Sequence, residues 1–237
     1  MKQFGVEIEV LFDRLHSRKP FAFSKYADGE WFMMRDIQIN NNEFNYTNND
    51  QFYRDKLIES FKYKHDDYYV GVSCPCCQGE AHWNMKVASE QREDHLTFAN
   101  IFVNSNYQFY VDNFIPEYSN WDIHLVANKN AKIENLPFKV EKFYPVENTA
   151  WKYNYPLIDE IKGLNLNNKL FLFACGPFGN MLAHQLWEHN QNNTYLDIGS
   201  TLNPWLQSEG FKRDYYIGDT VYAGRLCIWG NCTDKNN

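Results

Sequence analysis

Short apolar runs recur along the chain, and segments with helical spacing or polar composition separate them. Such runs predict buried β-strands, because a strand of this length buries its side chains without needing a helical period. We expect strands over residues 21–24, 68–73, 107–111, 123–127, 138–146, 169–175 and 194–198. The run over 169–175 is almost continuously hydrophobic, which is typical of a central parallel strand that is buried on both faces.

The segments between these runs carry apolar residues at near-helical spacing, which predicts amphipathic helices. Val6–Leu15 fits a helix, although Ile8–Val10 also alternates like a strand. Polar residues 40–50 predict a loop or short hairpin, with Asp50 as the N-cap of the next helix. We expect helices beginning near residue 31 and over 52–63, 81–103, 151–161 and 181–189, with a charged patch at 90–94 interrupting or exposing one of them.

Strands that alternate with helices predict an α/β fold. The strand, turn, helix and strand over residues 169–198 form a βαβ crossover. We therefore expect a Rossmann-like, mostly parallel, doubly wound sheet flanked by helices. We expect a single domain over residues 1–237, with residues 233–237 as a frayed polar tail.

Charge and composition exclude some classes of function. The formal net charge of -7 argues against a broad basic face, and so against duplex nucleic acid as a partner. No apolar run approaches the ~20 residues of a membrane-spanning helix. Residues 1–14 lack the apolar core of a signal peptide. We expect a cytoplasmic protein whose cysteines are reduced.

Two carboxylates, Asp28 and Glu30, lie where the first strand ends and a helix begins. Gly29 between them allows a tight turn. Adjacent carboxylates repel unless a cation or an array of donors joins them, and Mn²⁺ or Mg²⁺ suits such oxygen ligands. The pair predicts a metal or phosphate site at the edge of the sheet where α/β proteins bind ligands. The alternative is a solvated turn.

The turn Gly176–Asn180 lies between a buried strand and a helix. Its amides and the helix N-terminus favour a phosphate, while the alternative is a tight turn that lets helix and strand pack. Asp197 ends the following strand, where an acid can hold a ribose hydroxyl, a base, a metal or an acceptor hydroxyl. Its alternative role is a cap or turn residue.

The segment Cys74-Pro-Cys-Cys77 has the wrong spacing for paired zinc ligands, even with His82 and His95 downstream. Cys74, Cys76 and Cys77 more simply form a loop at a strand's carboxyl end that lines the pocket. A cysteine nucleophile paired with one of the histidines has no supporting motif.

Three segments together resemble one family. They are Ser24-Lys-Tyr-Ala-Asp-Gly-Glu30, Phe171-Leu-Phe-Ala-Cys-Gly-Pro177 followed by Leu182-Ala183, and Tyr195-Leu-Asp-Ile-Gly199. Their order and separation resemble the GT-D class of bacterial glycosyltransferases, over about residues 20–206. Pro145, Asn148 and Trp151 match a further element of that class. Lys25 stands where the class usually has Arg, Ala27 where it has Gly, and Ser200 where it has His.

The resemblance implies a Rossmann-like glycosyltransferase that uses a nucleotide sugar, typically a UDP-sugar, with Mn²⁺ or Mg²⁺. It implies metal and nucleotide binding by Asp28 and Glu30. It places Lys25, Gly29, Asn148, Gly176, Pro177 and Gly199 in the cofactor-binding motifs and Asp28, Glu30 and Asp197 in the catalytic set. Ser200 in place of His puts the metal in question. The acceptor would be the hydroxyl of a glycan, glycoprotein or glycolipid.

Several roles stay open on the sequence. Asp197 and Glu80 are both candidates for the catalytic base. Four tryptophans offer stacking surfaces for a base or sugar, and each also fits the core: Trp31, Trp83, Trp151 and Trp205. The alternative functions are another Rossmann-type enzyme, a methyltransferase or nucleotide-dependent oxidoreductase, or a non-catalytic nucleotide-sugar binder.

Overall fold

A computed structural model of the chain describes Met1, residues 4–41 and residues 44–207. Within them, seven parallel strands form one sheet in the order β5-β4-β1-β9-β8-β6-β7, and a two-stranded antiparallel hairpin forms a second. The sheet strands are β1 (Ala22–Lys25), β4 (Tyr68–Val72), β5 (Leu96–Phe98), β6 (Ile123–Asn128), β7 (Lys142–Val146), β8 (Leu170–Ala174) and β9 (Thr194–Asp197), and the hairpin strands are β2 (Ile39–Asn40) and β3 (Asn45–Tyr46). The predicted parallel α/β sheet is confirmed, and every pairing within it is parallel.

The strand order reverses beside β1, which pairs with β4 on one side and with β9 on the other. The chain leaves β1 toward β4 and β5, and it returns to β9 only after building β6, β7 and β8. Because all these strands are parallel, the residues that follow β1 and β9 emerge side by side at one edge of the sheet. This edge is the topological switch point at which α/β folds bind ligands.

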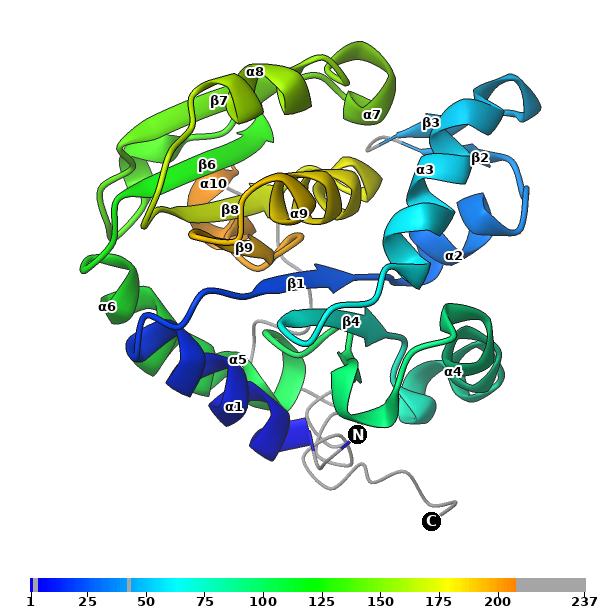
Figure 1. Ribbon diagram of the computed structural model, residues 1–237, viewed down its shortest axis with the longest axis horizontal. Coiled ribbons are helices and arrows are strands. Elements are labelled where there is room, and N and C mark those ends of the chain that lie inside the picture. The colour runs from blue at the N-terminus through cyan, green and yellow to red at the C-terminus, as the bar shows by residue number, and fades with distance from the viewer. Residues whose placement is uncertain (2–3, 42–43, 208–237) are drawn as a thin grey trace.

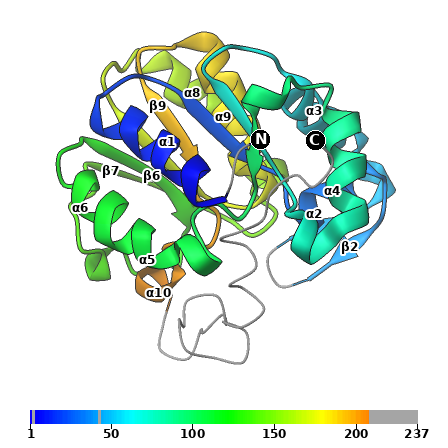
Figure 2. The ribbon, with the colours of Figure 1, turned by 90° about the horizontal axis from the view of Figure 1, so that it is seen from below.

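Helices cover both faces of the sheet (Figures 1 and 2). One face packs against α2 (Asp28–Met34), α3 (Gln51–Lys62), α4 (Pro75–Ser89), α7 (Ala150–Tyr153), α8 (Leu157–Gly163) and α9 (Pro177–His189). The other packs against α1 (Phe4–His16), α6 (Ile115–Tyr118) and α10 (Asn203–Leu206), together with α5 (Tyr107–Phe109) and the π-helical turn Tyr110–Phe114. The ribbon shows α2, α3 and α4 gathered beyond the arrowhead of β1 (Figure 1).

Strand β8 shows why the sheet needs two covered faces. Phe171 and Phe173 pack into the core on the α9 side, while Leu170 and Leu172 pack into the core on the α1 side. All four side chains are at most 1% exposed. A strand with no polar face is stable only between two helical layers, so its sequence required the three-layer arrangement.

Two predicted elements are wrong. The helix expected over 81–103 ends at Ser89, where Glu90 takes a left-handed conformation (φ 56°), and Leu96–Phe98 forms the edge strand β5 instead. Backbone pairing with β4 decides this local ambiguity. Residues 107–111, expected as a strand, are helical, and in this form Phe109 packs against Phe12 of α1 and Tyr110 against Tyr118 of α6.

The bounds of other elements differ from the predicted ones for local reasons. The helix expected over 151–161 is two helices, α7 and α8, separated by Asn154–Pro156, because Pro156 cannot continue a helix. Helix α9 begins at Pro177 rather than at residue 181. Asp50 is the N-cap residue of α3, as predicted, but its carboxylate makes no capping hydrogen bond and binds Thr47 and Lys152 instead. The predicted hairpin and the helix over 6–15 are confirmed.

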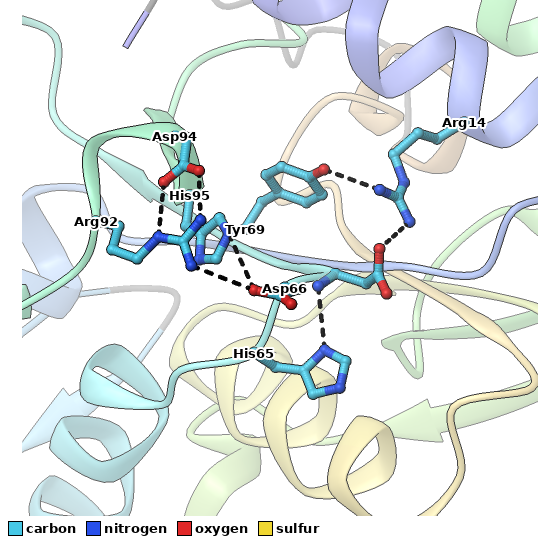
Figure 3. Close-up of polar contacts among 8 residues, drawn as sticks. Arg14, His65, Asp66, Tyr69, Arg92, Asp94 and His95 are labelled. Atoms are coloured by element: carbon cyan, nitrogen blue, oxygen red, sulfur yellow. Dashed lines mark hydrogen bonds and ion pairs between the residues drawn. The ribbon is translucent and has the colours of Figure 1, made fainter.

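A polar network closes the edge of the sheet opposite the switch point (Figure 3). Arg14 at the end of α1 donates to Tyr69 Oη at 3.0 Å and to the Pro20 carbonyl at 2.9 Å, and it pairs with Asp67. Nearby, the more exposed Arg92 pairs with Asp94 at 2.6 Å. The Arg14 guanidinium therefore ties α1 to the segments that lead into β1 and β4.

Candidate functional site

A cavity of about 300 Å³ opens at the carboxyl ends of β5, β4, β1 and β9. Residues that follow each of these four strands form its wall. They are Lys25, Ala27, Asp28, Ser73, Cys74, Gln78, Ala99, Asn100, Phe102, Val103, Asn104, Ile198, Ser200 and Thr201. The cavity thus lies where the strand order predicts a ligand site.

The turn from β1 into α2 separates the two predicted acids. Asp28 is exposed and lines the cavity. Glu30, only 4% exposed, turns back so that its Oε2 accepts the Ala27 backbone N–H at 2.9 Å. This contact is one half of a capping box, which satisfies an amide at the start of α2. Asp28 is therefore available to a ligand, while Glu30 holds the turn.

Asp197 at the end of β9 lies beneath the cavity wall and is 1% exposed. Its carboxylate accepts the backbone N–H of Lys25 at 3.4 Å and that of Gly199 at 3.2 Å. The pKa of Asp197 is raised from 3.8 to about 7, chiefly by burial; the Lys25 charge opposes this rise and the Glu30 charge adds to it. In this position Asp197 holds the ends of β1 and β9 together.

Gly199 leaves the space that the Lys25 side chain occupies. Gly199 has a φ of 53°, and a Cβ added there would overlap the Lys25 Cε, Cδ and Nζ atoms. The aliphatic stem of Lys25 therefore packs directly on the Gly199 backbone. Both conformation and space require glycine at this position.

The predicted glycine turn packs close to the acid turn without lining this cavity. Asn180 Nδ2 in α9 donates to the Lys25 carbonyl at 2.6 Å and to Ser24 Oγ at 3.0 Å. The Phe44 ring lies against both turns: an added Cβ would be 2.9 Å from it at Gly29 and 3.8 Å at Gly176. Pro177 begins α9, and Asn148, beyond β7, accepts from Asn128 Nδ2 at 2.7 Å. The binding roles of these residues stay predictions.

Polar residues after β4 and β5 complete the wall. Ser73 Oγ donates to Gln78 Oε1 at 2.8 Å, and Cys74, buried, begins α4 as its N-cap. Cys74 lines the cavity, as predicted, but the loop expected over 74–77 is wrong, because residues 75–77 begin α4. The sequence did not point to Asn100 and Asn104, because residues 81–103 were predicted as one helix. Recognising β5 as a strand would have identified them, since Asn100 follows its end closely.

The donor set does not suit the predicted divalent ion. Among the described wall residues, Asp28 supplies the one carboxylate. Glu30 is committed to the Ala27 amide, and Ser200 offers a hydroxyl where the GT-D resemblance implies His. In the part of the chain that the structure describes, no three His, Cys, Asp or Glu side chains come together as a metal site. Mn²⁺ or Mg²⁺ at Asp28 and Glu30 stays an untested prediction.

The cavity instead combines one ammonium, one carboxylate, hydroxyls, amides and an apolar wall. Such a mixture fits a ligand that has both an anionic and an uncharged polar part. None of the four candidate tryptophans lines the cavity, and Trp151 is fully buried against Phe44. Within the described residues, no helix has the length and apolar character needed to cross a bilayer.

Comparisons with known proteins place the fold. No family model matches the sequence. No curated protein matches it either. Among solved structures, the chain is similar to a domain of unknown function 1792 described as having a distinct glycosyltransferase fold, with 13% identity, coverage of 90% of this chain and 91% of the other, and a TM-score of 0.60.

A second similar structure is a glycosyltransferase from Streptococcus sanguinis that carries the same domain. The identity is 13%, the coverage is 92% of this chain and 96% of the other, and the TM-score is 0.60. The chain therefore has the glycosyltransferase fold of these domains, which agrees with the resemblance to the GT-D class.

Proposed function

We propose that the chain is a glycosyltransferase that moves a sugar from a nucleotide-sugar donor to a hydroxyl acceptor. The observation that carries this proposal is the cavity at the β1–β9 switch point, in a fold shared with glycosyltransferase-type domains over nine-tenths of the chain. The resemblance to the GT-D class favours a UDP-sugar as donor. The acceptor is a glycan, glycoprotein or glycolipid.

The proposed reaction uses the two charged wall residues. The acceptor oxygen attacks the anomeric carbon, and the bond from that carbon to the β-phosphate oxygen breaks. The electron pair leaves with the nucleoside diphosphate, and the acceptor proton passes to a base. Asp28 is the carboxylate exposed to the cavity, so we assign it this proton or, before transfer, a hydrogen bond to the attacking hydroxyl.

The test of this proposal measures release of nucleoside diphosphate from a panel of UDP-, GDP- and dTDP-sugars. When no other acceptor is added, water takes its place and the donor is hydrolysed. Asp28→Asn should lower the rate about 100-fold, the usual contribution of a general base, without changing the melting temperature. Asp159→Asn provides the matched control, because its side chain is 87% exposed on α8, away from the cavity.

Other outcomes separate the alternatives. A thermal shift with S-adenosylmethionine or NAD, and none with any nucleotide sugar, would overturn the proposal in favour of another Rossmann-type enzyme. Binding of a nucleotide sugar without release of diphosphate, with any acceptor offered, would leave a non-catalytic binder. Equal rates for the wild type and Asp28→Asn would remove Asp28 from the mechanism.

A further inference from the structure

Lys25 is the one cationic side chain among the described residues that line the cavity. It ends β1, an interior strand between β4 and β9, so it lies at the switch point of the ligand-binding edge. A departing nucleoside diphosphate develops negative charge that an enzyme must offset, usually with a cation or with preorganised donors. The cavity therefore brings a lysine to the place where the proposed reaction requires positive charge.

Backbone and side-chain contacts from two elements fix this lysine. Its N–H donates to Asp197, and its carbonyl accepts from Asn180 Nδ2. Its stem packs on Gly199, where any larger residue would displace it. A charge held in this way loses little freedom when a ligand arrives, and preorganisation of this kind makes electrostatic stabilisation effective.

The same structure argues against the divalent ion that acidic pairs usually recruit. A cation with two carboxylate ligands would need Glu30 to leave the Ala27 amide, which would leave that partly buried N–H without its acceptor. Asp28 and the Lys25 ammonium line the same cavity, so the ammonium charge opposes the attraction of Asp28 for a divalent cation.

We propose that the Lys25 ammonium, and not a divalent cation, offsets the charge of the departing nucleoside diphosphate. This inference rests on the proposed function. As the bond between the anomeric carbon and the phosphate oxygen breaks, the electron pair passes to the diphosphate, whose oxygens accept hydrogen bonds from the ammonium. Lysine is a common phosphate ligand that acts as a point charge.

The experiment follows diphosphate release and UDP affinity after extensive dialysis against EDTA, with and without added Mn²⁺. The wild-type rate and UDP affinity should differ less than about twofold between the two conditions. Lys25→Met should lower the rate in EDTA at least about 100-fold, the scale of one lost oxyanion-type interaction. Lys25→Arg, which keeps the charge, should retain most of the UDP affinity.

Two further variants complete the experiment. One is a control for the loss of a lysine elsewhere, and the other displaces Lys25 without removing it. Lys129→Met removes an exposed lysine at the same sheet edge, outside the cavity, and should behave as the wild type. Gly199→Ala keeps Lys25 and displaces its stem, so it should weaken UDP binding as Lys25→Met does. Circular dichroism melting curves establish that each variant is folded.

The outcomes distinguish this inference from the proposed function. A wild-type rate that disappears in EDTA and returns with Mn²⁺, while Lys25→Met remains active, overturns the role of Lys25 and leaves a glycosyltransferase. No UDP binding and no diphosphate release by the wild type under either condition overturns both. A metal-independent rate that depends on Lys25 supports both.

Discussion

At the scale of single residues, the site contains three neighbouring acids, Asp28, Glu30 and Asp197, and each has a different role. Asp28 faces the cavity, Glu30 caps the turn that presents it, and Asp197 lies buried below. Burial gives Asp197 a preference for the protonated form in the folded protein. Stability must then depend on pH through this residue.

The first prediction concerns Asp197→Asn. The folded-state pKa of about 7 exceeds the unfolded value of 3.8, so the protonated acid contributes stability below pH 4. That contribution is lost as pH rises toward 7, because a buried charge replaces the neutral acid. Asn mimics the protonated form at every pH. The melting temperature of Asp197→Asn relative to the wild type should therefore rise between pH 5 and pH 8.

Asp159→Asn again provides the exposed control, and its difference from the wild type should stay flat over the same range. A flat difference for Asp197→Asn as well would mean that this carboxylate is ionised when folded at pH 5. In that case the Lys25 charge, and not burial, would dominate its environment.

At the scale of elements, the edge strand β5 carries one wall of the cavity. It pairs with β4 through three residue positions, and the wall residues Asn100 and Asn104 follow it. Gly71 in β4 permits this pairing. A Cβ there would lie 3.1 Å from the backbone N and Cα of Ala99 and 2.9 Å from the Phe23 ring.

We predict that Gly71→Ala destabilises the protein by about 1–3 kcal/mol, since the added methyl group meets backbone that cannot rotate away. It should also weaken UDP binding, because the β5 wall must move outward. Urea unfolding and calorimetric titration measure the two effects. Gly163→Ala at the end of α8 has open space around the new methyl, so it should neither destabilise the protein nor weaken UDP binding.

Helices and strands could be predicted from the sequence where one hydrophobic pattern extended through the whole segment. The continuous apolar run of β8 admitted one interpretation, and the structure confirms it. Leu96–Phe98 could not be assigned in the same way, because three residues are too few to show a period. Its pairing with β4, distant in sequence, decides its conformation.

The candidate site was predictable only in part, for a related reason. Sequence order places Asp28, Lys25 and Asp197 at strand ends, and parallel strands bring those ends together. It does not show which way a side chain turns: Glu30 looked equivalent to Asp28 until its contact with the Ala27 amide appeared. Cytoplasmic location and the absence of nucleic-acid partners stay predictions.

At the scale of the whole molecule, the two edges of the sheet do different work. The carboxyl edge holds the cavity and its charged groups, Lys25 and Asp28. The opposite edge is closed by the Arg14 network (Figure 3). This division suits an enzyme, because a rigid edge keeps in position the strands that carry a polar site at the other edge.

The division predicts that stability and binding can be separated. Arg14→Met should destabilise the protein by about 1–3 kcal/mol, because it leaves a half-buried Asp67 and the Pro20 carbonyl without their donor. Arg92→Met, at a pair whose side chains are 64% and 63% exposed, should cost less than about 1 kcal/mol. Both variants should bind UDP with wild-type affinity at 20 °C, since neither residue lies at the carboxyl edge. Weaker binding by folded Arg14→Met would show instead that the two edges are coupled through β1 and β4, whose leading segments Arg14 joins.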